Sequence, residues 1–334
     1  MIRRVLFRNT WLAVISFCCF SGIICGQVST DANNGGSGEP LMVLQQKARD
    51  GDVKAMYLLG WHFMSGTNVR QDYEEAARWF QEAASKGSTN AQFVLGYLYE
   101  QGKGVKRDYE QAAQYYAAAA RQGHTMAENN LGSLYHQGKG VPKDLAQAER
   151  WYRAGAEHGD TTAQCNLASL YYLGEGVRRD YAEAFRWFQA AAEKDFAPAQ
   201  DNLASMYYSG TGVERDYPEA AKWTRRAAEQ GYARAQTDLA YLYENRKGVP
   251  LDYVSAYHWY SIATQGGDER SRERMKNLAK VMTKKQIRET KASLNGSVAV
   301  RADNQMSQHD QGMTCDEYLE QRRKCLKFSK ENSR

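Results

Sequence analysis

The sequence repeats itself at a fixed period of 36 residues, six times in succession and without a gap. Self-similarity at a period between about 20 and 50 residues is typical of repeat proteins, in which each unit packs only against its neighbours. Such a chain does not fold around one central core, because no unit buries its apolar face alone. The units begin at Ala55, Ala91, Ala127, Ala163, Ala199 and Ala235.

Each unit predicts two helices. In the first, an Ala, a Leu and an aromatic residue recur at helical spacing, as in Ala91, Leu95 and Tyr99, and so share one face. A Gly-x-Gly-Val turn ends this helix, since glycine accepts the left-handed conformation. The second helix begins at an Asp suited to capping, and a Glu or Gln three residues later resembles a capping box in five units. These aspartates are Asp72, Asp108, Asp144, Asp180, Asp216 and Asp252.

Small and aromatic residues indicate how the two helices pack. A small residue follows the Leu of each first helix and permits a close crossing. We expect each second helix to bury one large ring, namely Trp79, Tyr115, Trp151, Trp187, Trp223 or Trp259. Asn68 and Arg246 replace turn glycines, and Asp195 replaces the Gly that ends the second helix elsewhere. Asn visits the left-handed region readily, whereas we expect Arg246 to distort the sixth turn.

These patterns predict an all-α fold, a right-handed α-solenoid of stacked helical hairpins. The six repeats occupy residues 55–267, between an N-terminal half-repeat cap at 40–54 and C-terminal capping helices at 268–292. Residues 27–39 are predicted to be a disordered leader, and residues 293–334 a flexible tail with a Cys pair.

Residues 1–26 are typical of a signal peptide. A basic segment precedes an apolar run from Trp11 to Ile24, which is shorter than the roughly 20 residues that span a bilayer. A cleavage site follows Gly26. Cys25 leaves a lipoprotein as the less favoured alternative, because Ile24 precedes it where lipoprotein signals need a small residue. We therefore expect a periplasmic or secreted protein with no membrane span.

The net charge of +5 does not indicate nucleic-acid binding. Basic side chains concentrate in residues 1–26 and 268–334, so the body between them is mildly acidic. We expect no nucleic-acid partner.

The repeats resemble Sel1-like repeats (SLR), relatives of tetratricopeptide repeats, over residues 40–292. The pattern A-x-x-x-L-G/A-x-x-Y, then G-x-G-V, D-x-x-x-A-x-x-W and a closing Gly, stands nearly complete in units two to five. The resemblance implies a scaffold that binds proteins, with exported bacterial members in envelope assembly, signalling or host contact. Eukaryotic members work in quality control in the endoplasmic reticulum, and a cysteine-rich subfamily has been linked to β-lactam binding or hydrolysis.

The motifs of common enzyme classes are missing from the sequence. The six histidines show no metal-binding spacing, and there is neither a nucleophile elbow nor a phosphate loop. We expect a non-catalytic protein without cofactor or metal. A β-lactam enzyme remains one alternative, although Cys165 is the only Cys within the repeats. A luminal quality-control adaptor in a eukaryote is another, with Asn295 in the one credible glycosylation sequon of the mature chain.

The side of the first helices opposite their buried stripe is the candidate binding surface. In such solenoids this side lines a concave groove, and here it is aromatic at its N-terminal end. Exposed aromatic residues with Met are typical of binding hot spots; alternatively, the leader covers them. A ladder of Asn on the flank could pair with an extended ligand or bond neighbouring helices. The candidate residues are Tyr57, Trp61, Met64, Phe93, Tyr97, Asn130, Asn166 and Asn202.

The remaining features lie near the C-terminus. Cys315 and Cys325 could form a disulfide in an oxidising compartment or remain two thiols, and Cys165 is predicted to lie on an exposed face. A basic stretch could touch anionic lipid or polysaccharide, or be a solvated tail. Its side chains are Arg322, Arg323, Lys324, Lys327 and Lys330.

Overall fold

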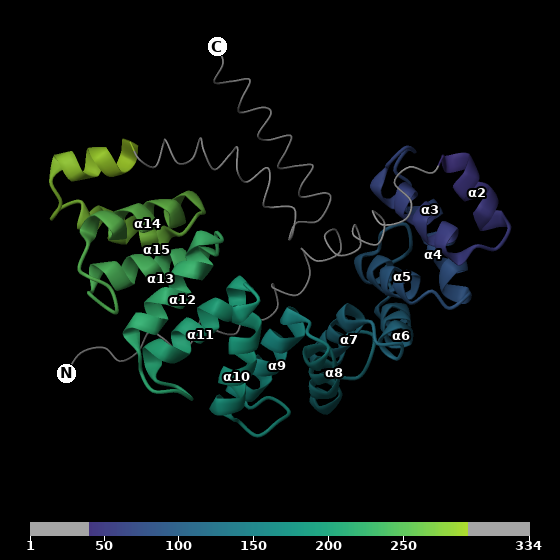
Figure 1. Ribbon diagram of the computed structural model, residues 1–334, viewed down its shortest axis with the longest axis horizontal. Helices are drawn as coiled ribbons and strands as arrows, with labels where there is room; N and C mark the ends of the chain where they lie inside the picture. Colours follow the sequence, from purple (N-terminus) through teal and green to yellow (C-terminus); the bar gives the residue numbers. More distant parts are fainter. Residues whose placement is uncertain (1–39, 293–334) are drawn as a thin grey trace, which may run out of the picture. The chain divides into compact units, whose positions relative to one another are not determined.

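The computed structural model describes residues 40–292, and every regular element in this range is a helix (Figure 1). A helical segment at 284–292 follows the last of the helices named below. This architecture confirms the predicted all-α fold of tandem hairpins. The helices are α2 (Leu41–Arg49), α3 (Val53–Ser65), α4 (Tyr73–Ser85), α5 (Thr89–Gln101), α6 (Tyr109–Ala120), α7 (Thr125–Gln137), α8 (Leu145–Glu157), α9 (Thr161–Leu173), α10 (Tyr181–Glu193), α11 (Ala197–Ser209), α12 (Tyr217–Glu229), α13 (Ala233–Glu244), α14 (Tyr253–Gln265) and α15 (Glu269–Leu278).

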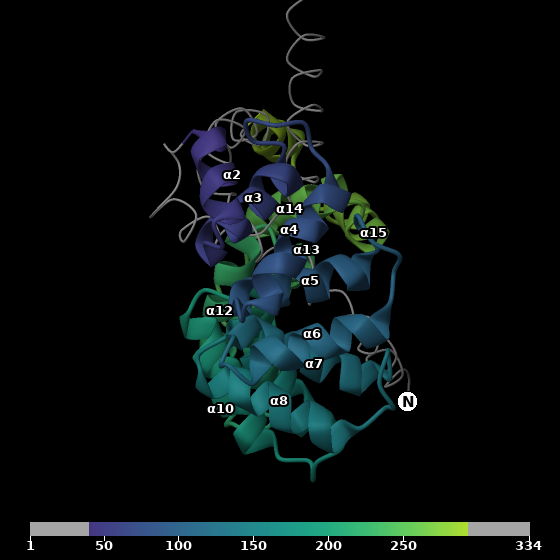
Figure 2. The ribbon, with the colours of Figure 1, turned by 90° about the vertical axis from the view of Figure 1, so that its right-hand side faces the viewer.

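The chain forms two compact units, and the division falls within α8. The described part of unit 1 is 40–155 and that of unit 2 is 156–292. From α2 to α7 in unit 1, and from α9 to α15 in unit 2, each helix packs on the next along the chain (Figures 1 and 2). Each repeat pairs a first helix, the A helix (α3, α5, α7, α9, α11 and α13), with a second, the B helix (α4, α6, α8, α10, α12 and α14).

The predicted aspartates cap the B helices. Asp108 Oδ1, for example, accepts the backbone N–H groups of Glu110 at 2.9 Å and Gln111 at 3.1 Å. The N–H of Asp108 itself donates to the carbonyl of Tyr99 in the A helix at 2.9 Å, and the other five aspartates bond their A helices in the same way. The capping box is therefore only half formed. In a complete box, the Glu or Gln side chain would accept the N–H of the capping Asp, but here that N–H donates to a carbonyl of the A helix.

The ring that each B helix buries is one residue later than predicted. Trp79 and its equivalents are half-buried, whereas the following residue is buried in its own hairpin, as Phe80 and Tyr116 are. The reason lies in the packing of the hairpin, since the side chains of Phe80 and Tyr116 point directly at the A helix. Trp223 is the buried exception, in the repeat where Thr224 stands in place of the ring.

A close crossing of A and B helices places the buried ring against the small residue of the A helix. A methyl group added at Gly96 would lie 2.5 Å from Cδ1 of Tyr116, and one at Gly60 would lie 2.7 Å from Cε1 of Phe80. Real carbon atoms do not approach so closely. The glycine therefore sets the distance between the two helices of these repeats.

The non-glycine turn residues keep the conformation of the glycines that they replace. Asn68, Asp195 and Arg246 have φ values of 62°, 61° and 53°. The expected distortion at Arg246 is limited, since α13 ends at Glu244 but Lys247 still donates its N–H to Leu242 at 3.0 Å. The left-handed conformation costs a residue with a side chain roughly 1–2 kcal/mol. All three residues adopt it, so the rest of the fold offsets this cost.

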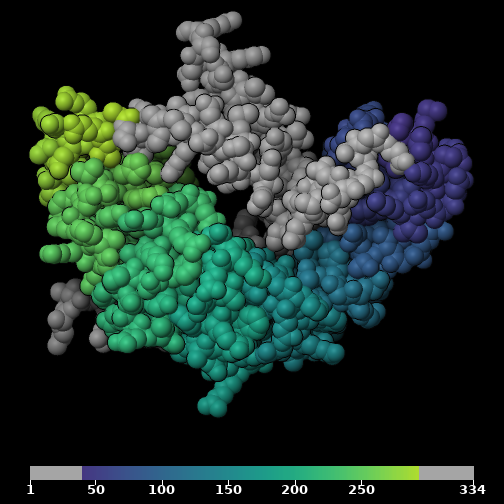
Figure 3. Space-filling model, in the orientation of Figure 1, coloured from purple at the N-terminus to yellow at the C-terminus, as the bar shows by residue number. Residues whose placement is uncertain are grey.

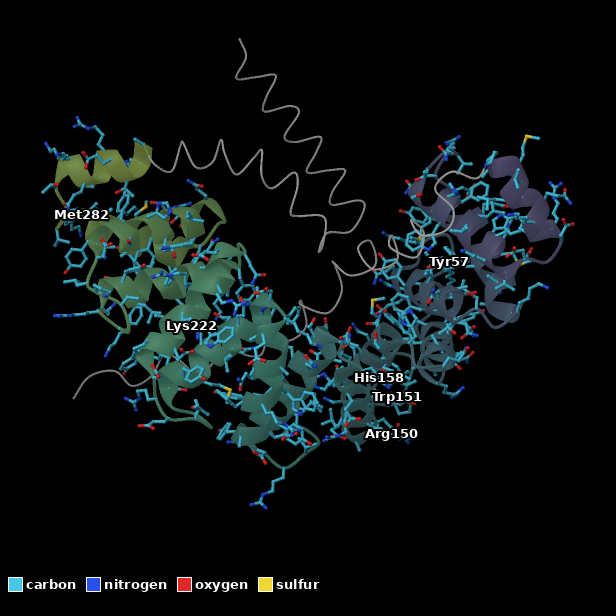
Figure 4. All side chains as sticks on the ribbon, viewed as in Figure 1. Tyr57, Arg150, Trp151, His158, Lys222 and Met282 are labelled. Carbon is cyan, nitrogen blue, oxygen red and sulfur yellow. The ribbon has the colours of Figure 1, made fainter. Side chains whose placement is uncertain are left out.

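Additional helices cover both ends of the described repeats. At the N-terminal end, α2 buries Leu44 and Ala48 and packs on α3. At the other end, Leu278 and Met282 belong to one buried cluster with Tyr257 and Tyr260 of α14. Figure 4 labels Met282 at this end of unit 2. A terminal hairpin needs such a cover because it has a neighbour on one side only. In the space-filling view, successive hairpins of unit 2 lie packed side by side (Figure 3).

We predict that Gly96→Ala destabilises the protein by about 1–3 kcal/mol, the usual cost of overpacking a core. The Tyr116 ring is completely buried, and the added methyl group would lie 2.5 Å from it. Urea unfolding followed by circular dichroism measures the change. Gln114→Ala, at an exposed site of α6, is the control and should leave the midpoint unchanged. Equal midpoints for both variants would show that the helices do not cross this closely.

Candidate functional site

The aromatic residues predicted to line the groove all lie in unit 1, but most of them are buried. Tyr57, Phe93 and Tyr97 are exposed by only 7%, 2% and 8%, so the prediction of an exposed face is wrong for these three. Trp61 and Met64 are half-buried and remain within reach of a partner. Figure 4 shows Tyr57 among the helices of unit 1.

Packing between helices explains the burial. The ring of Tyr57 meets Phe80 of its own hairpin edge-on, with centroids 5.8 Å apart. Phe93 stacks on His124, which caps the A helix of the next repeat, at 4.4 Å. These positions therefore lie within a hairpin or between two hairpins, whereas the sequence pattern predicted that they face solvent.

Trp61 lies at the edge of this aromatic cluster. Its ring contacts Tyr57 and Phe80 edge-on, with centroid distances of 6.4 Å and 6.2 Å. Its Nε1–H finds no acceptor among the described residues. The ring is held by its packing against the buried residues of unit 1.

Glu100 is a buried acid near the C-terminal end of α5. The hydroxyl of Tyr116 donates to Glu100 Oε2 at 2.8 Å. Burial raises the pKa of Glu100 to about 7, while the Tyr116 hydrogen bond and the charge of Lys139 act in the opposite direction. The carboxyl is 8% exposed, so its ionisation affects folding as well as any ligand.

Two members of the Asn ladder bond neighbouring helices, which was the alternative interpretation: Asn130 of α7 is hydrogen-bonded to Tyr116 of α6, and Asn202 of α11 contacts α9. Asn130 and Asn166 are buried, and only Asn202 is half-buried. The Asn130 Oδ1 accepts from Asn129 Nδ2 at 3.2 Å, and Asn202 Nδ2 of α11 donates to Cys165 Sγ of α9 at 3.8 Å. Cys165 is buried, so its predicted exposure is also wrong.

Unit 2 carries a charged group that the sequence interpretation missed. Arg234 Nε lies 3.4 Å from Asp201 Oδ2 and 3.7 Å from Asp238 Oδ2. Burial raises the pKa of Asp201 to about 7, against the nearby positive charge of Arg234. The repeat period contained a signal for Asp238, since this residue continues the register of Asn130, Asn166 and Asn202 with a carboxylate in place of an amide.

A hollow of about 750 Å³ opens on the turn side of unit 1. Its lining includes Tyr99, Arg107 and Tyr109, and the Arg107 guanidinium lies 5.8 Å from the centre of the Tyr109 ring. Asp108 and Glu110 also line it, which balances the charge. The hollow is built from the turn that every repeat shares and contains no nucleophile paired with a base.

Several predicted features lie outside the described residues, namely the signal peptide, the leader, the Cys315 and Cys325 pair and the basic stretch. Within residues 40–292, no three side chains of His, Cys, Asp and Glu gather in a way that could hold a metal ion. No helix in this part of the chain has the length and apolar character needed to cross a bilayer.

The chain matches the family model of the Sel1 repeat six times in tandem, at residues 53–88, 89–124, 125–160, 161–196, 197–232 and 233–268. A crystal structure of a protective antigen of uropathogenic Escherichia coli, which displays an SLR fold, is 37% identical with a TM-score of 0.69. The match covers 71% of this chain and 51% of the antigen, so the chain spans about half of that protein. A Sel1 repeat protein from Oxalobacter formigenes is 32% identical with a TM-score of 0.60, over 65% of this chain and 87% of that one. No curated protein matches the chain significantly.

The raised pKa of Glu100 predicts that Glu100→Gln becomes more stabilising, relative to the wild type, as pH rises. The folded wild type holds a proton that the unfolded chain releases from about pH 4.5, so its stability falls between pH 4.5 and about 7. At pH 8 we expect the variant to be more stable by roughly 1–3 kcal/mol. Urea unfolding across this pH range tests the prediction, with the exposed Glu82→Gln as control. A stability difference independent of pH would contradict it.

Proposed function

The chain belongs to the Sel1 repeat family, and from this membership we propose that it is a non-catalytic scaffold that binds a protein or peptide partner. The observation that carries the proposal is the run of six in-register repeats, which presents side chains of successive A helices along one side of each unit. Such surfaces are the usual means by which helical repeat proteins bind other proteins.

We place the principal contact of unit 1 at Trp61 and Met64, at the edge of the cluster formed by Tyr57, Phe80 and Trp61. Both side chains are half-buried, so a partner can cover them without unfolding a hairpin. Buried aromatic anchors of this kind contribute most of the energy of many protein interfaces. Phe93, Tyr97 and the Asn ladder would act indirectly, by supporting the A helices.

Replacement of Trp61 by Ala tests this placement, and Trp79→Ala is its matched control. The two tryptophans belong to one repeat, both are half-buried, and neither Nε1 has an acceptor within the described range. They differ in that Trp61 lies on the A helix and Trp79 on the B helix. We expect Trp61→Ala to weaken partner capture at least about tenfold and Trp79→Ala to leave it unchanged.

The measurement is crosslinking and mass spectrometry of proteins captured by the full mature chain in its native compartment. Thermal unfolding of each variant verifies that the fold is retained. A partner captured equally by both variants would move the site away from Trp61. A chain that captures no protein would contradict the scaffold function itself.

We also propose that the protein is exported and cleaved after Gly26, as the basic and apolar segments of residues 1–26 suggest. Export would fit a role in envelope assembly, signalling or host contact, and the similar E. coli protein is a protective antigen. Intact-mass spectrometry of protein recovered from the envelope or medium should give a chain that begins at Gln27. A chain that retains Met1, or one lipidated at Cys25, would refute this cleavage.

A further inference from the structure

Successive repeats contact each other at the Gly-x-Gly-Val turn, as two turns of unit 2 show. The second glycine of each turn packs against the first residue of the preceding B helix. A methyl group added at Gly212 would lie 2.5 Å from the carbonyl oxygen of Tyr181, and one added at Gly248 would overlap the carbonyl of Tyr217. A side chain at this point of the turn would therefore push the two repeats apart.

A cation lies over the tyrosine that begins the preceding B helix. Lys247, between the two glycines of its turn, places Nζ 4.6 Å from the centre of the Tyr217 ring. Where the turn has Thr211 at this point, the Arg179 guanidinium lies 5.9 Å from the centre of the Tyr181 ring instead. The corresponding pairs of unit 1 are Lys103 with Tyr73 and Lys139 with Tyr109. Each of these four tyrosines is therefore paired with a cation, an arrangement that cation–π attraction favours.

Tyr253, the fifth tyrosine at this position, is paired with no cation among residues 40–292. Leu251 stands where Arg215 stands in the preceding repeat. No further turn follows, because residues 282–285 replace the Gly-x-Gly-Val pattern and a helical segment begins at residue 284. Tyr253 and Leu251 are 37% and 49% exposed, and we call these two side chains the open edge.

The open edge is exposed although α15 covers α14. The α15 helix begins one repeat period after α13, so it takes the place of a seventh A helix and packs on α14 (Figure 1). The cap thus supplies the helix of a further repeat but not its turn. A turn from another molecule can therefore contact the start of α14 without displacing α15.

We propose that the open edge binds a Gly-Lys-Gly segment of a protein partner, in the way that the chain's own turns bind the preceding repeat. The Lys ammonium lies over the Tyr253 ring, and the glycine after it contacts the first turn of α14. Leu251 adds exposed apolar surface. The argument for this occupant is continuity with the contact that earlier repeats already make. The inference rests on the proposed scaffold function and adds a second contact, in unit 2.

The chain itself offers no segment that fits the open edge as well. In a second copy, the first turn is the one with no preceding repeat, but Thr67 and Asn68 stand there in place of a cation and the second glycine. The side chain of Asn68 would meet the obstacle described for Gly212 and Gly248. Residues 293–334 contain no Gly-Lys-Gly sequence.

A ligand-observed NMR titration of the full mature chain, which measures weak binding, tests the proposal. The first probe is the blocked peptide Gly-Lys-Gly-Val, the second has norleucine in place of Lys, and the third has Ala in place of the second Gly. We expect the first probe to bind about two- to fivefold more tightly than the norleucine peptide, the effect of one exposed cation–π pair. The Ala peptide should bind at least about fivefold more weakly than the first, because its methyl group overlaps the start of α14. Equal binding of the three peptides would overturn the proposal.

Two variants locate the binding. Tyr253→Leu should remove the preference for Lys over norleucine and leave the melting temperature unchanged, because Leu145 holds the same position in the third repeat. Tyr217→Leu is the matched control and should bind the peptides like the wild type, since Lys247 already covers that ring. Equal loss in both variants, or loss in neither, would overturn the site.

Two further measurements test the competing occupants. Sedimentation velocity should give the wild type and Tyr253→Leu the same oligomeric state; a dimer that the substitution abolishes would assign the open edge to a second copy. Peptide binding should not change when the basic side chains of the tail are replaced by Gln. Binding more than about tenfold tighter would show that the tail covers the edge, as expected for a tethered competitor, and would overturn the assignment to a partner. The replaced residues are Arg322, Arg323, Lys324, Lys327 and Lys330.

Failure of the open edge and failure of the scaffold function give different results. Trp61→Ala should retain binding of the Gly-Lys-Gly-Val peptide. Partner capture by a chain that does not distinguish Lys from norleucine would contradict the open edge alone, whereas loss of all protein capture would contradict the scaffold function.

Discussion

In the first three repeats, the contact between a buried ring of the B helix and a glycine of the A helix controls the geometry of the hairpin. Tyr116 on Gly96 and Phe80 on Gly60 bring the helices closer than any pair of residues with Cβ atoms would allow. The Asp caps act at the other end of the same hairpin, where the backbone N–H of Asp108 bonds the A helix and its carboxylate bonds the B helix. The two contacts together hold the angle and the spacing of the hairpin.

The same close crossing explains part of the polar character of the A helices. A buried Tyr hydroxyl needs an acceptor, and Glu100 and Glu244 occupy equivalent A-helix positions opposite Tyr116 and Tyr260. Where the buried ring is Phe80 or Phe188, the A helix carries Met64 or Tyr172 instead. Glu100 is therefore a structural acceptor whose raised pKa follows from its depth in the hairpin.

Once these structural roles are assigned, the surfaces that remain for binding differ between the units. Unit 1 retains a half-buried Trp61 at the edge of an aromatic cluster, which suits an apolar partner side chain. In unit 2, Arg234 lies between the carboxylates of Asp201 and Asp238. The two units thus carry different side chains on the same repeated backbone, and the difference arises at a few A-helix positions.

Most of the fold was predictable from the sequence because helix period, caps and turns depend on residues close together in the chain. The Asp caps, the closing glycines and the limits of the hairpins follow from such local signals, and even Asp195 and Arg246 adopt the turn that the period demands. Burial at Tyr57, Phe93 and Cys165, and the choice of Phe80 over Trp79 as the enclosed ring, were decided only in the tertiary structure. Those features depend on how closely helices pack, and the grouping of Asp201 with Arg234 and Asp238 depends on the stacking of one repeat on the next. A helical period gives the direction of a side chain from its own axis but not the distance to the neighbouring helix.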